Sequence, residues 1–107
     1  MREDNNLSQE VLLKKAMEFH KKGNIREATN CYKKFIEMGF IDPRVFSNLG
    51  VIYKDLGRLD EAEDLTRKAI QLDPKYTIAF TNLGNVLISM GKYEEAEKYT
   101  HQAIQLN

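Results

Sequence analysis

The feature that most constrains this chain is an internal repeat with a period of 34 residues. Residues 46–72 read FSNLGVIYKDLGRLDEAEDLTRKAIQL, and residues 80–106 read FTNLGNVLISMGKYEEAEKYTHQAIQL. Residues 12–38 follow the same frame more weakly, because Gly23 and Ala28 take the places of Gly57 and Ala62. Three similar units therefore fill almost the whole chain. Self-similarity at this period is typical of repeat architectures, in which each unit buries its apolar face against its neighbours.

Each unit reads as two helices joined by a glycine turn. In the second unit, apolar residues recur at helical spacing from Phe46 to Leu56, and Gly57 ends the pattern. A second apolar stripe runs from Leu59 to Leu72, where Asp73-Pro74 stops it because proline disfavours helix in the preceding residue. Glycine within a helix costs roughly 1 kcal/mol relative to alanine, so its presence there indicates close helix contact. Small residues stand at the expected contacts in all three units: Ala16, Gly50 and Gly84 on the first helices, and Ala28, Ala62 and Ala96 on the second.

These motifs resemble the tetratricopeptide repeat family from about Gln9 to Asn107. The matching features are the period, the Leu-Gly pair, the Gly-x-x-x-Glu-Ala turn and the closing Leu-Asp-Pro. The resemblance implies an all-α fold in which three tandem helix-turn-helix hairpins stack into a short right-handed α-solenoid. It places the repeats at about 9–42, 43–76 and 77–107, in a single domain 1–107 without a C-terminal capping helix. The family's second-helix aromatic is Tyr32 in the first unit but Thr66 and Thr100 later, which predicts looser packing there.

Two helix starts carry capping signals. Residues 1–7 are expected to form a polar lead, with Ser8 as the N-cap of a helix over about residues 9–22. Asp42-Pro43 predicts a second start, with Asp42 as N-cap and Pro43 as the first helical residue. Later in the chain, Glu63 and Arg67 are opposite charges four residues apart, and we expect an exposed pair worth a few tenths of a kcal/mol.

Composition excludes several classes of function. The chain has 16 basic and 16 acidic residues, so no overall charge attracts it to nucleic acid or to a membrane surface. No segment has the unbroken apolar length of a bilayer span, and the first residues lack the apolar core of a signal peptide. The single cysteine, Cys31, cannot form an internal disulfide, which fits a reducing compartment. We therefore expect a soluble cytoplasmic protein with a protein or peptide partner.

No catalytic chemistry is expected from these residues. His20, Cys31 and His101 are isolated and do not share a helix face, so neither a metal site nor a cofactor is predicted. No serine lies in a nucleophile turn, and no glycine-rich phosphate loop follows a strand. The sequence therefore predicts that the chain is not an enzyme.

The resemblance places function on the outward face of the first helices, which in this family lines a concave groove that holds a partner segment. Asn48 and Asn82 occupy equivalent positions there, and a carboxamide can both donate to and accept from the backbone of an extended peptide. The pair is similar to the asparagine ladder of O-linked N-acetylglucosamine transferases, although Lys14 interrupts the ladder in the first unit. The alternative is that these asparagines are simply polar residues on a solvated face. The predicted peptide-binding residues are Lys14, Met17, Arg44, Asn48, Val51, Asn82 and Asn85, with Lys14 and Arg44 selecting charge.

The groove does not resemble the family's chaperone carboxylate clamp. Leu13 and Met17 stand where that clamp needs a lysine and an asparagine, and Asn82 stands where it needs an arginine. Only Asn48 agrees with the clamp. We therefore do not expect a dedicated binding site for acidic chaperone tails.

A second function class is self-assembly, or a scaffold role as the N-terminal part of a longer protein. The last helix is expected to leave an apolar face uncovered, and such faces favour association. We predict a homodimer in which two copies cover each other about a two-fold axis. The predicted contact residues are Tyr93, Ala96, Tyr99, Ala103 and Ile104.

Overall fold

The computed structural model describes the backbone of residues 2–106 and the side chains of residues 8–106. Within that part of the chain, six α-helices form three successive hairpins, so the predicted all-α class is confirmed. The chain divides into two compact units, Met1–Ile41 (unit 1) and Asp42–Asn107 (unit 2).

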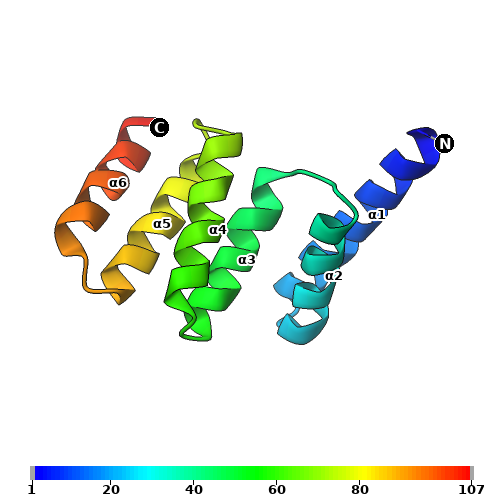
Figure 1. Ribbon diagram of the computed structural model, residues 1–107, viewed down its shortest axis with the longest axis horizontal. Helices are drawn as coiled ribbons and strands as arrows, with labels where there is room; N and C mark the ends of the chain where they lie inside the picture. The colour runs from blue at the N-terminus through cyan, green and yellow to red at the C-terminus, as the bar shows by residue number, and fades with distance from the viewer. Residues whose placement is uncertain (1, 107) are drawn as a thin grey trace. The chain divides into compact units, whose positions relative to one another are not determined.

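Unit 1 is one hairpin made of α1 (Arg2–Lys21) and α2 (Ile25–Glu37), shown in blue to cyan in Figure 1. Its core contains Ala16, Ala28, Tyr32 and Phe35, which are all completely buried. Helix α1 already begins at Arg2, so the predicted polar lead up to Ser8 is wrong for residues 2–7. The reason is that Ser8 only favours a cap, whereas no proline or glycine in residues 2–7 stops the helix from extending.

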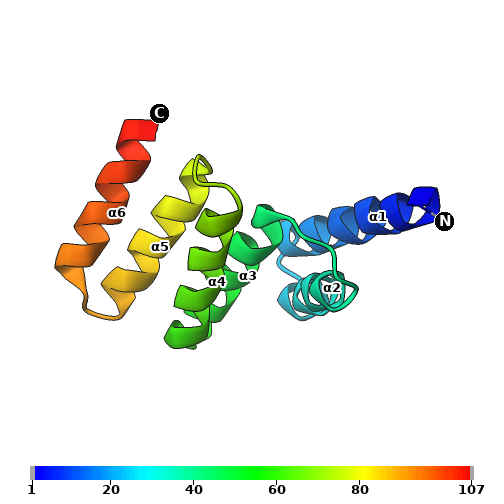
Figure 2. The same ribbon diagram turned by 45° about the horizontal axis from the view of Figure 1, so that its top comes forward.

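Unit 2 contains two hairpins, α3 (Pro43–Asp55) with α4 (Leu59–Leu72), and α5 (Thr77–Ser89) with α6 (Tyr93–Leu106). Helix α5 packs against the three other helices of the unit, and Figures 1 and 2 show it between α4 and α6. Gly57 and Gly91 make the turns with φ angles of 80° and 78°, a conformation that other residues rarely adopt. Apolar side chains from α4, α5 and α6 meet in one core formed by Ile70, Leu83, Leu87, Met90, Ala96 and Tyr99.

The helices of each hairpin in unit 2 touch through glycine and threonine. A Cβ atom built on Gly50 would lie 2.7 Å from Cγ2 of Thr66, and one built on Gly84 would lie 2.5 Å from Cγ2 of Thr100. Thr66 is fully buried, and its hydroxyl donates to the carbonyl oxygen of Ala62 at 2.9 Å. The expectation of loose packing at the two threonines is therefore wrong, because each threonine methyl group fills the space left by a glycine.

Asp42 caps α3 as predicted. Its carboxylate accepts a hydrogen bond from the backbone N–H of Arg44 at 2.9 Å, and Pro43 is the first helical residue. Burial by itself raises the pKa of Asp42, but the hydrogen bonds from the guanidinium and the backbone N–H of Arg44 outweigh it, so the pKa lies below its usual value.

Replacing Asp42 by alanine is expected to lower the free energy of unfolding by about 1 kcal/mol at pH 7, the typical loss of an N-cap. A carboxyl group with a lowered native pKa stabilises the fold above its unfolded pKa, and this contribution is lost as pH falls through the native value. The difference between Asp42→Ala and the wild type should therefore shrink below about pH 4. Urea denaturation of both proteins at pH 7 and pH 3 measures it. A difference that stays constant across this range would contradict the assigned cap.

Candidate functional site

Helices α3 and α5 pack against each other in unit 2 and share a surface that we call the α3/α5 face. Repeat-equivalent positions on the two helices supply it, because side chains three or four residues apart lie on one side of a helix. Its exposed or half-buried residues are Arg44, Asn48, Val51, Lys54, Asp55, Ile78, Thr81, Asn82, Asn85, Ile88 and Ser89.

Asn82 connects α5 to α3. Its side-chain Nδ2 donates a hydrogen bond of 2.7 Å to the hydroxyl Oγ of Ser47, which is fully buried on α3. One of the two Asn82 donor hydrogens is therefore already used within the protein, whereas Asn85, one turn later, is exposed. Asn82 thus fixes the spacing of the two helices, a role that the repeat pattern did not reveal.

Replacing Asn82 by alanine should lower the free energy of unfolding by about 1–3 kcal/mol, because the buried Ser47 hydroxyl loses its donor. Replacing both Asn82 and Ser47 by alanine should cost less than the sum of the single changes, since the double variant leaves no orphaned group. Thermal melting of the wild type, both single variants and the double variant measures this coupling. Additive effects would mean that the hydrogen bond contributes nothing to stability.

Arg44 is not a free cation on this face. Its guanidinium donates to both carboxylate oxygens of Asp42, at 3.1 Å from Nε and 2.8 Å from Nη2. The side-chain hydrogen bond to Asp42 raises the pKa of Arg44, so the pair keeps both charges. Lys54 is likewise paired with Asp55 at 3.3 Å. The role of Arg44 in selecting charge stays a prediction, and an anion that binds there would share the guanidinium with Asp42.

The structure brings five of the seven predicted peptide-binding residues together. Arg44, Asn48, Val51, Asn82 and Asn85 belong to the α3/α5 face. Lys14 and Met17 are exposed on α1 and belong to unit 1, while Leu13 next to them is buried.

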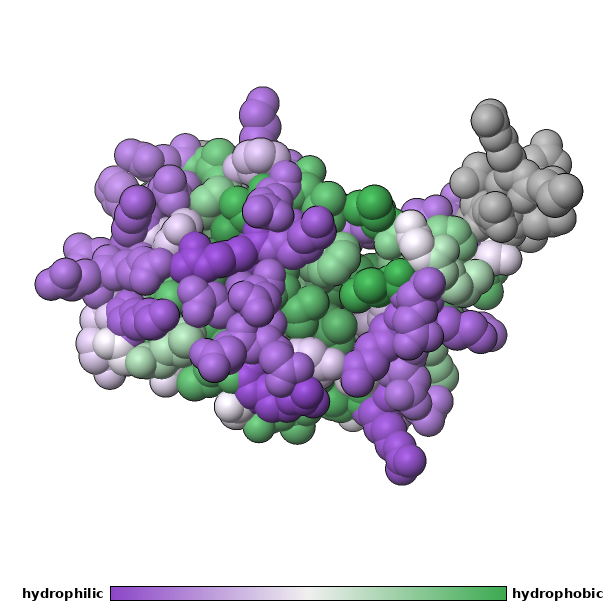
Figure 3. Space-filling model, in the orientation of Figure 1, coloured by the Kyte–Doolittle hydropathy of each residue, from purple (hydrophilic) through white to green (hydrophobic). Residues whose placement is uncertain are grey.

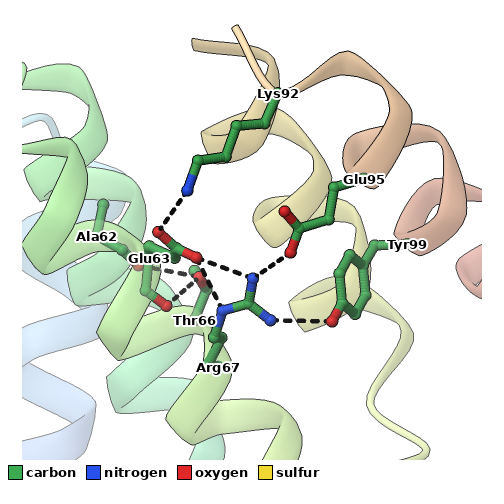
Figure 4. A network of polar contacts seen from close by, with 7 residues as sticks. All are labelled: Ala62, Glu63, Thr66, Arg67, Lys92, Glu95 and Tyr99. Carbon is green, nitrogen blue, oxygen red and sulfur yellow. Dashed lines mark hydrogen bonds and ion pairs between the residues drawn. The ribbon is translucent and has the colours of Figure 1, made fainter. Parts of the chain in front are cut away.

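A polar network between α4 and α6 was missed by the sequence patterns. Arg67 on α4 donates to Glu95 at 2.6 Å, to the Tyr99 hydroxyl at 2.9 Å and to Glu63 at 2.9 Å (Figure 4). Lys92 also lies 3.7 Å from Glu63. Only the spacing of Glu63 and Arg67 was visible in the sequence, and it indicated a local pair. The network instead links the second and third hairpins.

Hydrophilic side chains cover much of the side of unit 2 that faces the viewer in Figure 3.

The five residues predicted for self-association do not form one exposed patch. Tyr93 and Ile104 are exposed, at 68% and 71% of their surface. Ala96 and Ala103 are buried, so their predicted exposure is wrong. Ala96 packs in the core with Leu83 and Leu87 of α5. Tyr99 is half-buried, and its hydroxyl accepts the hydrogen bond from Arg67.

Comparison with known families and structures assigns the chain to a family. Residues 9–38, 43–76 and 77–107 match the tetratricopeptide repeat. The chain belongs to the tetratricopeptide repeat family, and is thus a protein-interaction module, as the sequence predicted. None of the helices in the described residues has the length and apolar character to cross a membrane. A search of curated proteins finds no match.

Several solved structures resemble this chain. The first tetratricopeptide domain of Spaghetti (RPAP3), bound to an HSP90 peptide, is 28% identical, with a TM-score of 0.85 over 92% of this chain and 79% of that chain. MamA is 26% identical, with a TM-score of 0.85 over 92% of this chain and 58% of that one. An O-GlcNAc transferase of Thermobaculum terrenum is 25% identical, with a TM-score of 0.91 over 95% of this chain and 20% of that one.

Proposed function

We propose that the α3/α5 face binds an extended segment of a partner protein. The observation that supports this is the pairing of two adjacent helices that expose carboxamide and aliphatic groups rather than a continuous charged surface. Asn48 and Val51 contribute from α3, and Asn85 contributes from α5. Packed helices lie roughly 10 Å apart, so an extended segment that runs along the α3/α5 face is within reach of side chains from both helices.

The similar structures support a peptide as the partner. The related RPAP3 domain is described as bound to an HSP90 peptide. A carboxamide such as Asn85 can accept from one backbone N–H of a peptide and donate to one carbonyl, whatever side chains the peptide carries. This chemistry gives modest affinity, because a hydrogen bond contributes only about 0.5–1.5 kcal/mol net.

A peptide library selected on the purified chain provides ligands for a test of this proposal. The strongest peptides are then titrated against the wild type and against Asn85→Ala, which removes an exposed side chain of the α3/α5 face. Loss of one hydrogen bond should weaken binding roughly three- to tenfold. Asn30→Ala is the matched control, because Asn30 is also an exposed helical asparagine but lies on α2. Asn82 is unsuitable for this test, since its loss also disturbs Ser47.

Chemical shift mapping locates the bound peptide independently. Perturbed amides should cluster on α3 and α5. Selected peptides that instead perturb the Arg67 network and leave Asn48 and Asn85 unaffected would refute the α3/α5 face as the binding site.

Self-association through the outer side of α6 is a second candidate. It is favoured by the large exposed side chains of Tyr93 and Ile104 on that helix. The contact is smaller than the sequence predicted, because Ala96 and Ala103 are buried. The hydroxyl of Tyr99 is bonded to Arg67 within the protein.

Ile104→Glu is therefore expected to abolish self-association, because dimer formation would bury the new carboxylate without a partner. Sedimentation of the wild type and the variant over a broad concentration range measures this effect. A wild type that stays monomeric throughout would refute the candidate.

A further inference from the structure

Helix α5 contains no charged residue, although 30% of the residues in the chain are charged. Core positions account for only part of this composition. The buried apolar residues of α5 are Ala79, Phe80, Leu83, Val86 and Leu87. The solvent-facing stripe is equally uncharged, and consists of Ile78, Thr81, Asn85, Ile88 and Ser89. Ile78 and Ile88 are exposed at 53% and 47% of their surface, so packing within the protein does not require them to be aliphatic.

The preceding repeat shows what these positions can otherwise hold. Ile78 is the repeat counterpart of Arg44, and Ile88 is the counterpart of Lys54. The two cations of α3 are replaced by isoleucine in α5, on the outward side of both helices. Single exposed aliphatic residues are common on protein surfaces, but two of them on one side of an uncharged helix form a stripe that an apolar group of another molecule can cover.

The charges that border this stripe are already paired. Arg44 binds Asp42 through two hydrogen bonds, and Lys54 lies 3.3 Å from Asp55. The α3/α5 face therefore carries two ion pairs with no net charge beside an uncharged helix, so a carboxylate of a ligand would compete with Asp42 or Asp55 for each cation. A strongly acidic ligand would lose its hydration against the isoleucines without gaining a counter-charge.

Spacing on α5 sets the geometry of the ligand. Ile78 and Ile88 are ten residues apart, which corresponds to about 15 Å along an α-helix. In an extended segment, side chains on the same side recur every second residue, and four residues advance about 13 Å. Two ligand side chains four residues apart can therefore contact both isoleucines, while Asn85 between them binds the intervening backbone.

From these observations we infer that the α3/α5 face recognises an extended, uncharged segment with two aliphatic side chains four residues apart, rather than an acidic tail. This inference rests on the proposed function of the same face. It adds the chemical class and spacing of the ligand, which the function alone leaves open.

Three capped peptides of equal length test the inference by titration against the full chain. The first is uncharged and carries two leucines four residues apart in a serine and threonine background. The second has the same composition with the leucines three residues apart, which places them on opposite sides of an extended chain. The third is the acidic HSP90 peptide found with the related RPAP3 domain. The first peptide should bind at least tenfold more tightly than either of the others.

The variant Ile78→Arg/Ile88→Lys gives α5 the side chains that stand at the same positions on α3. Because those residues are accommodated in the preceding repeat, the variant should fold, and circular dichroism and thermal melting check this. It should bind the first peptide at least tenfold more weakly, and the acidic peptide more tightly than the wild type does. Ile25→Arg is the matched control, because it replaces an exposed isoleucine on α2, outside the α3/α5 face, and should leave peptide affinity unchanged.

The outcomes separate the inference from the proposed function. If the acidic peptide binds the wild type as tightly as the first peptide and perturbs α3 and α5, the inference is wrong and the binding face stands. Equal binding of the first two peptides would overturn the spacing, and absence of binding by the first peptide would overturn the ligand class. If library peptides bind but perturb other helices, the proposed function fails as well.

Discussion

Replacing Gly50 by leucine is expected to lower the free energy of unfolding by about 1–3 kcal/mol or more, the usual cost of overpacking a core. Even the first added carbon would lie 2.7 Å from Cγ2 of Thr66, closer than van der Waals contact permits. Thr66 cannot easily move away, because it is fully buried and its hydroxyl is bonded to the carbonyl of Ala62. Each kcal/mol should lower the melting temperature by roughly 4–8 °C, which calorimetry measures directly.

A compensating substitution separates the clash from other effects of Gly50. Thr66→Ser removes Cγ2 and keeps the hydroxyl group. Gly50→Ala should destabilise the wild type but should be tolerated better in the Thr66→Ser background, where its Cβ has space. The same relation is expected for Gly84 and Thr100, whose Cγ2 would lie 2.5 Å from an added Cβ. Additive effects of the paired substitutions, or an unchanged melting temperature for Gly50→Leu, would contradict this contact.

The hairpin fold could be predicted because each repeat specifies it locally. The glycine turns and the apolar stripes are read within a single hairpin and recur every 34 residues in all three units, while the break at Asp73-Pro74 marks the end of the second unit alone. Gly50 indicated close helix contact for the same reason. Thr66 was misread because the family pattern gives an aromatic residue at its position. The volume of Thr66 alone does not show how the residue packed against it, Gly50, fits that volume.

The candidate site could be predicted only in outline. The repeat places Asn48 and Asn82 at equivalent positions, and the structure puts both on the α3/α5 face. The pattern does not show what either side chain contacts within the protein, such as the bond from Asn82 to Ser47. That bond joins residues 35 positions apart, so local spacing could not reveal it. Likewise, Arg44 was interpreted as a charge selector because its pairing with Asp42 was not foreseen. That pair forms because the helix cap brings the two side chains together.

The burial of Ala96 and Ala103 has a similar cause. The sequence predicted two contacts for Ala96, one with the first helix of its own hairpin and one with a second copy, and its burial beside Leu83 and Leu87 confirms the first. Both alanines are buried, while larger residues of α6, such as Ile104, remain exposed. Small size in this family therefore indicates close packing within the hairpin rather than an open face.

Arg67 is expected to be the most important polar residue for the link between the second and third hairpins. Burial by itself lowers the pKa of Arg67, but its hydrogen bonds to Tyr99, Glu63 and Glu95 outweigh this effect and raise it, so the guanidinium stays charged at any usual pH. It also lies over the ring of Tyr99, 5.3 Å from the ring centre. One side chain thus joins α4 to α6 (Figure 4).

Arg67→Met keeps most of the aliphatic stem and removes the guanidinium. Hydrogen bonds to charged groups contribute about 1.5–3 kcal/mol each when desolvated, but the Arg67 side chain is 35% exposed, so solvent screening reduces the expected loss to about 1–2 kcal/mol in total. The loss should become smaller in concentrated salt, which screens the pairs with Glu63 and Glu95. Urea denaturation at low and high ionic strength measures both effects.

Arg58→Met is the matched control for this prediction. Arg58 donates to both carboxylate oxygens of Glu61 at 2.7 Å. This pair is exposed, and both residues lie at the start of α4. Holding two exposed side chains together costs entropy that offsets their attraction. Arg58 also lies over the ring of Tyr53, 4.6 Å from the ring centre, so both variants lose an aromatic contact. Arg58→Met should therefore lower the melting temperature less than Arg67→Met does, because it breaks no link between two hairpins. Equal effects of the two substitutions would show that the position of Arg67 between the hairpins has no energetic importance. A larger effect at Arg67 would locate the stabilisation in its contacts with Glu95 and Tyr99, which Arg58 lacks.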